Sequence, residues 1–302
     1  MKTTLRMLAG FGVASWALYA GAIPMTFSAA GADPANIQAQ VDLYRMALGA
    51  LNGNVAGSFG SGRREINWDG VPDAFSAPNN LPANFFNVNS PRGVVFGTPG
   101  TGFQVSANAG VAPVEFGNID PSYPSLFETF SAQRLFTSLG SNIVDVSFFI
   151  PGSMTPAFTT GFGAVFTDVD FASTSSLQFF GAANNSLGTF FVPAVAGPNP
   201  TLSFLGVQFT EGAVVSRVRI TSGNQILAAG NTTEDLVALD DFIYGEPRIA
   251  QQIPEPATLL LLALSLFTLG AFRLRAAVPV SEAISQIAKQ RVEGRQRKRA
   301  FV

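Results

Sequence analysis

Short runs of Val, Phe, Ile and Thr, separated by clusters of Gly, Pro and Asn, fill residues 63–247. Branched and aromatic residues favour strands, and Gly, Pro and Asn favour the turns between them. Because no long helical pattern interrupts the runs, the spacing predicts an all-β domain, a jelly-roll-like β-sandwich. The strands that we expect are 93–96, 102–106, 114–116, 126–130, 143–150, 161–170, 176–180, 188–192, 202–209, 214–220 and 236–244.

The chain contains no cysteine and no histidine. This composition excludes disulfides, thiol nucleophiles, zinc sites built from Cys and His, haem ligation by His and Ser-His-Asp catalysis. The 28 phenylalanines supply large apolar side chains for a core that has no covalent cross-links. We predict no catalytic residues, and any metal would be a hard cation such as calcium on oxygen ligands.

A helix-like segment precedes this domain. Apolar residues recur at helical spacing at Ile37, Val41, Tyr44 and Leu48, and a Gly/Ser-rich stretch follows them. We therefore expect residues 33–62 to form a helical extension and a linker.

The first residues carry the pattern of a secretory signal peptide. Lys2 and Arg6 precede an apolar stretch, and an Ala-Gly-Ala triplet that ends at Ala32 offers a cleavage site. The pattern predicts a signal peptide over residues 1–32, with a helical apolar part. A second Ala-Gly-Ala triplet ends at Ala22, so an earlier cut also fits.

A second apolar segment lies near the other end of the sequence. In order come Pro254, Glu255, Pro256, the uncharged residues 257–272, Arg273 and Arg275. As a helix, the run of about 16 residues would measure roughly 24 Å, somewhat less than the ~30 Å hydrocarbon core, and the arginines can snorkel to the interface. We predict one transmembrane helix, with the basic tail 276–302 in the cytoplasm.

The element at 253–275 resembles the PEP-CTERM sorting signal, a tripartite tag of exported bacterial proteins that an exosortase-type membrane protease processes. The resemblance implies an inner-membrane-anchored precursor and a mature form at the cell surface or in the extracellular matrix of a Gram-negative-type bacterium. The phrases GRREINWDG, GAVFTDVD and DDFIYGEP resemble a domain of exported bacterial proteins of unassigned function. That resemblance implies a secreted β-sandwich and brings no catalytic residues with it.

Charge is divided between the body and the tail. Residues 33–252 contain 17 acidic and 8 basic residues, whereas residues 273–302 contain 8 basic and 2 acidic residues. Nucleic-acid binding needs clustered positive charge, so an acidic exported body is a poor partner for nucleic acid. A basic tail beside a membrane span is expected from the attraction of anionic lipids.

The segment Asn67-Trp68-Asp69 is a candidate ligand site. The Trp ring would stack on a sugar while the polar pair accepts and donates hydrogen bonds to its hydroxyls. The alternative is that Trp68 closes the end of the sandwich as a core residue.

Two acidic pairs are candidate calcium ligands. At period two, Asp168 and Asp170 leave one strand on the same side, where calcium or the pair Arg217 and Arg219 would neutralise them.

The second acidic pair is Asp240 and Asp241. The two residues lie on opposite faces of their strand, and each shares its face with apolar residues. Whichever face is buried therefore contains a carboxylate, which must be hydrogen-bonded, paired with Arg or bound to a metal.

These features favour an exported, non-enzymatic envelope or matrix protein whose sandwich binds exopolysaccharide, another glycan or other matrix material. A jelly-roll glycan hydrolase with two carboxylates, among Glu65, Glu115 and Glu128, is the alternative from a different class. A passive structural or adhesive domain is the third interpretation.

Overall fold

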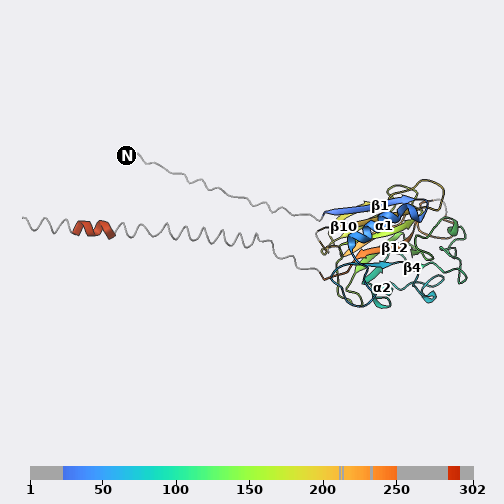
Figure 1. Cartoon of the computed structure of the whole chain (residues 1–302), viewed down its shortest axis with the longest axis horizontal. Helices are drawn as coiled ribbons and strands as arrows, with labels where there is room; N and C mark the ends of the chain where they lie inside the picture. The colour runs from blue at the N-terminus through green and yellow to red at the C-terminus, as the bar shows by residue number, and fades with distance from the viewer. Residues whose placement is uncertain (1–22, 211, 213, 232–233, 250–284, 293–302) are drawn as a thin grey trace, which may run out of the picture. The chain divides into compact units, whose positions relative to one another are not determined.

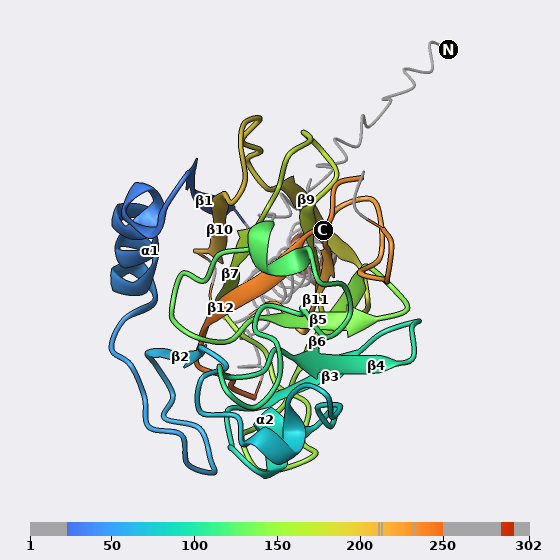
Figure 2. The same cartoon turned by 90° about the vertical axis from the view of Figure 1, so that its right-hand side faces the viewer.

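Two antiparallel β-sheets pack face to face in a computed structural model of the chain (Figures 1 and 2). The structure describes residues 23–249, except 211, 213, 232 and 233, and residues 285–292. The seven-stranded sheet runs in the order β1 (Pro24–Gly31), β10 (Leu202–Phe209), β7 (Gly161–Thr167), β12 (Ala238–Gly245), β5 (Phe136–Leu139) and β4 (Gly102–Val105), and β2 (Arg63–Ile66) also pairs with β12. The five-stranded sheet runs in the order β3 (Val94–Gly97), β6 (Ile143–Phe148), β11 (Arg217–Thr221), β8 (Ser176–Phe180) and β9 (Ser186–Phe191).

One apolar cluster fills the space between the sheets. Strand β7 contributes Phe162 and Phe166 from the larger sheet, and β11 contributes Val218 and Ile220 from the smaller one. These side chains alternate along their strands, because successive residues of a strand point to opposite faces. The structure thus confirms a sandwich of two antiparallel sheets, and the jelly-roll connectivity stays a prediction.

Helix α1 (Pro34–Leu48) covers the outer face of the larger sheet. Asp33 caps its first turn, because its side chain accepts the Asn36 N–H while the Asn36 side chain accepts the Asp33 N–H. The helix buries Tyr44 against the sheet, where the phenol O–H donates to the Val207 carbonyl oxygen at 3.2 Å. Figure 2 shows α1 beside β1 and β10, on the side away from β9 and β11. Strands β7 and β12 are therefore buried on both faces.

Two glycines make room for the Tyr44 ring. Gly163 and Gly206 face each other in the register of β7 and β10. A Cβ at Gly163 would lie 2.8 Å from Tyr44 Cε1, and one at Gly206 would lie 2.8 Å from Tyr44 Cγ. Since real Cβ atoms do not approach so closely, any other residue there would push the helix off the sheet.

The domain starts earlier than the sequence indicated. Strand β1, which lies within the expected signal peptide 1–32, pairs with β10 over its whole length. Helix α1 lies within the expected extension 33–62, yet its apolar face belongs to a buried cluster with β10 and β12. The boundary expected at Arg63 is thus corrected, because β1 and α1 complete the larger sheet.

Other departures concern individual strands. The sequence pattern did not predict strands β2 and β5. In β2 three of the four residues are charged, so the strand lacks the apolar residues that would indicate it. The expected strands 114–116 and 126–130 are instead loops, whose apolar residues Phe116 and Phe127 form a separate buried cluster with Tyr123. Short helices occur at η1 (Asp73–Phe75), α2 (Phe85–Val88) and η2 (Tyr123–Ser125).

The expected signal helix and the expected span 257–272 lie outside the described residues. Among the helices of the described ranges, none has the length and apolar character that crossing a bilayer requires. Residues 285–292 of the expected tail form a helix, and they belong to a second compact unit, 251–302.

We predict that the processed protein begins at Ile23, after the Ala-Gly-Ala triplet that ends at Ala22. A cut after Ala32 would remove β1 and leave β10 as an apolar sheet edge, which favours aggregation. N-terminal sequencing of the exported form should therefore read Ile-Pro-Met. A mature chain that begins at Asp33 would contradict this prediction, and replacing Ala32 by Phe, which blocks only the later site, should leave processing unchanged.

Candidate functional site

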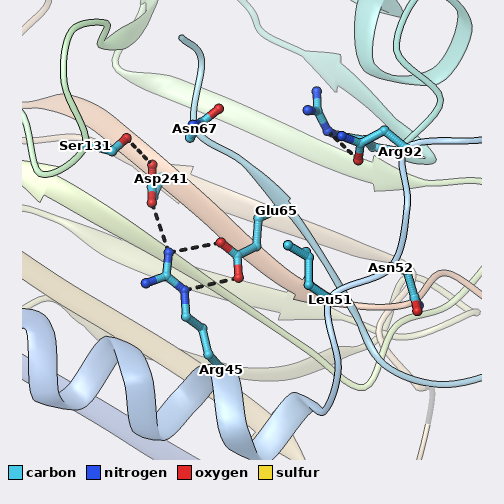
Figure 3. A pocket seen from close by; sticks show the side chains of 9 residues that line it. Arg45, Leu51, Asn52, Glu65, Asn67, Arg92, Ser131 and Asp241 are labelled. Atoms are coloured by element: carbon cyan, nitrogen blue, oxygen red, sulfur yellow. Dashed lines mark hydrogen bonds and ion pairs between the residues drawn. The ribbon is translucent and has the colours of Figure 1, made fainter. Parts of the chain in front are cut away.

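A polar cavity lies where β2 pairs with β12, so that the sequence phrases GRREINWDG and DDFIYGEP lie side by side. Its volume is about 310 Å³. Eight of its nine lining residues are polar or charged: Arg45, Asn52, Asn54, Glu65, Asn67, Arg92, Ser131 and Asp241, with Leu51 the ninth (Figure 3).

An ion-pair network forms one wall of this cavity. The Arg45 guanidinium donates to both Glu65 oxygens, at 3.1 Å from Nε and 2.9 Å from Nη2. The same Nη2 donates to Asp241 Oδ2 at 3.3 Å (Figure 3). Arg63 Nε adds a bond of 2.6 Å to Glu65. Each carboxylate of the wall thus has a cationic partner, and a ligand would meet a wall with little net charge.

The expected calcium ligands Asp240 and Asp241 support the same wall. Asp240 accepts the backbone N–H groups of Phe130, Ser131 and Asp241, at 2.6, 3.2 and 2.8 Å. Asp241 Oδ1 accepts the Ser131 hydroxyl at 2.7 Å. Hydrogen bonds therefore satisfy Asp240, and the Ser131 hydroxyl and Arg45 satisfy Asp241. Both hydrogen bonding and pairing with Arg were predicted alternatives for these carboxylates, and neither carboxylate requires a metal ion.

Burial changes the acidity of this pair. It raises the pKa of Asp241 to about 6, against the opposing effects of the Ser131 hydrogen bond and the Arg45 charge. Burial, and then the charge of Asp241, raise the pKa of Asp240 well above its ordinary value. Asp240 is therefore a buried carboxyl group whose hydrogen bonds hold the backbone at Phe130 and Ser131.

Other residues of the lining have unused hydrogen-bonding groups. Arg92 donates from Nε to Asn54 Oδ1 at 2.9 Å and from Nη1 to Ser90 Oγ at 3.0 Å, and its guanidinium lies 5.0 Å above the Phe86 ring. Within residues 23–249 as described, Arg92 Nη2, Asn54 Nδ2 and Asn67 Oδ1 have no hydrogen-bond partner in the protein. These three groups are available to a ligand.

Trp68 is not a ligand platform, which corrects the proposed stacking role. It is 1% exposed, and its ring stacks on Phe136 at a centroid distance of 4.2 Å. The alternative interpretation, a core residue, is the one that the structure supports. Of its two polar neighbours, Asn67 lines the cavity, whereas Asp69 accepts the backbone N–H groups of Gln133 and Arg134.

The other expected acidic pair, Asp168 and Asp170, lies at the far end of β7 with a third carboxylate, Asp235. Asp235 accepts the Asp170 N–H at 2.8 Å and also the Thr174 hydroxyl. The expected partners Arg217 and Arg219 instead bind Asp145, at 2.7 and 2.8 Å. The salt-bridge alternative is therefore wrong, because both arginines lie in the other sheet.

Asp168 lacks a full set of partners. It is 3% exposed, and its Oδ1, like Oδ1 of Asp170, is buried without a hydrogen bond. Burial, followed by the charges of Asp170 and Asp235, raises the pKa of Asp168 to about 8. No three Asp, Glu, His or Cys side chains of the described ranges are arranged to hold a metal ion, so calcium here would need carbonyl or water ligands too.

The three glutamates of the hydrolase alternative do not form one site. Glu65 belongs to the ion-pair network of the cavity. Burial, and then the charge of Glu128, raise the pKa of Glu115. Burial, and then the charge of Asp33, raise the pKa of Glu128 as well.

We predict that Asp168→Asn raises the melting temperature at pH 8. An unfolded Asp loses its proton near pH 4, whereas folded Asp168 keeps it until about pH 8. The folded chain therefore binds the extra proton between these values, and the free energy of unfolding falls as the pH rises through them. Melting curves at several pH values should show a smaller fall for Asp168→Asn than for the wild type.

Asp145→Asn is the matched control. Although burial opposes it, pairing with Arg219 and Arg217 holds the pKa of Asp145 below its ordinary value. This substitution should lower the melting temperature at pH 8, whereas Asp168→Asn should raise it. If Asp168 binds calcium, added calcium should raise the melting temperature of the wild type but not of Asp168→Asn. No response to calcium or to a chelator would remove the calcium hypothesis.

Comparison with known proteins identifies the element at the C-terminal side of the sandwich. The family model of the PEP-CTERM protein-sorting motif matches residues 252–276. The match contains all the expected sorting residues, which lie outside the described residues: Pro254, Glu255, Pro256, Arg273 and Arg275. No curated protein and no solved structure matches the chain.

The motif is the substrate signal of exosortase, a membrane protease, and implies export through the membrane to the cell surface. The chain is therefore a PEP-CTERM domain-containing protein with a sandwich of two antiparallel β-sheets.

Proposed function

We propose that this exported protein is a non-enzymatic component of the cell envelope or extracellular matrix. Its sandwich binds glycan, and the ligand occupies the cavity between β2, β12 and α1. Before sorting, the precursor is anchored in the inner membrane by the predicted span 257–272.

The lining of the cavity is the observation that carries this proposal. Two guanidinium groups, two carboxylates, three amides and one hydroxyl surround it, and only Leu51 is apolar. Arg45 and Arg63 pair with the two carboxylates, while Asn54, Asn67 and Arg92 retain free donors and acceptors. Such a surface suits a neutral molecule with many hydroxyl groups, because each hydroxyl both donates and accepts a hydrogen bond.

We predict that Asn54→Ala combined with Asn67→Ala weakens glycan binding. Each change removes a hydrogen bond to the ligand worth about 1 kcal/mol. Together they should raise the Kd roughly 10-fold or more. A glycan array would identify the ligand, and calorimetry on the wild type and the double variant would measure the change.

Asn80→Ala is a suitable control, because Asn80 is exposed and lies outside the cavity lining. Its Kd should equal that of the wild type. If the wild type and both variants bind equally, the glycan lies elsewhere on the protein. If no glycan on the array binds, the passive structural or adhesive interpretation is favoured.

We also predict that replacing Pro254, Glu255 and Pro256 by Ala leaves an unprocessed precursor in the membrane fraction. The substitution removes the Pro-Glu-Pro triplet near the start of the matched residues 252–276 and preserves the apolar run. Mass spectrometry of the surface-located wild type should detect no peptide from 276–302. An intact tail on that form would contradict processing at this element.

A hydrolase is the second candidate, and it rests on the pair Glu115 and Glu128. Burial raises the pKa of each, as the proton-donating acid of a glycosidase requires, whereas the second carboxylate of such a site must stay ionised. Reducing-sugar release that is lost in Glu128→Gln would favour this function. Binding without turnover favours the non-enzymatic proposal.

A further inference from the structure

Both ends of the described sandwich leave from the same end of the larger sheet. Strand β1 starts beside the last residue of β10, in the pair Pro24 and Phe209. The end of β10 lies beside the start of β7, which in turn lies beside the end of β12. Because the strands are antiparallel, Ile23 and Gly245 lie at one end, which we call the exit end.

Segments outside the sheet extend the exit end. Helix α1 finishes there, because Gln208 Nε2 near the end of β10 donates to the Ala47 carbonyl at 3.1 Å. The loop after α1 follows, since the Phe59 N–H donates to Glu246 Oε1 at 3.3 Å. Beyond β12, Arg248 pairs with Phe158, which precedes β7.

Large apolar side chains are exposed at the exit end. The exposed fractions are 46% for Met25, 67% for Met46, 53% for Phe59 and 65% for Ile249. They come from four separate segments, namely β1, α1, the loop after α1 and the residues after β12. Only the fold brings them to one end.

The chain also limits how far the exit end can lie from a membrane. The uncharged run of the sorting element starts at residue 257, eight positions after Ile249. Eight residues reach at most about 28 Å even when fully extended. On the other side, a signal peptide that is cleaved after Ala22, as predicted above, directly precedes Ile23. Both membrane-directed segments therefore join the sandwich at its exit end.

We propose that the exit end is a membrane-facing surface, and that its apolar side chains rest in the interfacial region of the lipid bilayer while the precursor is anchored. This inference rests on the anchoring of the sorting precursor in the proposed function. Apolar area removed from water supplies the attraction, at about 25 cal/mol per Å². The body between residues 33 and 252 is acidic, so its net charge does not favour binding to anionic lipid.

The absence of cysteine from the chain allows a direct test. Met46→Cys and Phe59→Cys label the exit end of the full-length chain. Val111→Cys and Phe171→Cys are matched controls, because both side chains are exposed apolar residues at the opposite end. Val111 lies in the loop between the end of β4 and the start of β5, and Phe171 follows the end of β7.

Each variant would be labelled with a bimane fluorophore and reconstituted into vesicles of phosphatidylcholine and phosphatidylglycerol that contain a lipid with a nitroxide headgroup. We expect loss of most of the fluorescence at positions 46 and 59 and little loss at 111 and 171. Equal quenching in the two sets would overturn the orientation, although vesicle flotation would still show that the chain is anchored. A chain that does not float with the vesicles would overturn the anchoring, and this inference with it.

Discussion

The pairing of β2 with β12 depends on a buried ion pair between Arg64 and Glu246. Both side chains are 0% exposed, and the guanidinium contacts both carboxylate oxygens, at 2.7 and 2.9 Å. The remaining Arg64 donors bind carbonyl oxygens of Val55, Gly57 and Pro91. Since removing one partner of such a pair leaves an uncompensated buried charge, at a cost of about 3–5 kcal/mol, this contact fixes the loop after α1 against the sheet.

The candidate cavity and the exit end both follow from that attachment. Glu65 and Asn67 stay beside Asp241 because Arg64 holds β2 in register with β12. Phe59 stays at the exit end because its N–H binds the same Glu246 carboxylate. One buried pair therefore positions both the polar cavity and the exposed Phe59 at the exit end.

Much of the fold could be predicted from the pattern of short strands, and the failures have identifiable causes. Strand β1 was missed because its small and apolar residues also fit a signal peptide. The sequence left open whether Trp68 stacks on a ligand or closes the core, although Ile66 and Trp68 continue the inward alternation of β2. Asp235 was missed because 65 positions separate it from Asp170, and no local pattern joins them. The predicted pairing of Arg217 and Arg219 with the two aspartates that follow β7 was wrong. Residue spacing along a strand does not reveal which of the two sheets contains that strand.

The sequence by itself determined the class of the fold, the acidic character of the body and the sorting motif, because each depends on composition or on residues that are neighbours in the chain. The tertiary structure decided that β1 and α1 belong to the sandwich, that Trp68 is buried and that Glu65 and Asp241 share one cavity. It also decided that both ends of the sandwich leave from one side. These outcomes depend on strand order and register, which join residues that lie far apart in the sequence, so no local pattern contains them.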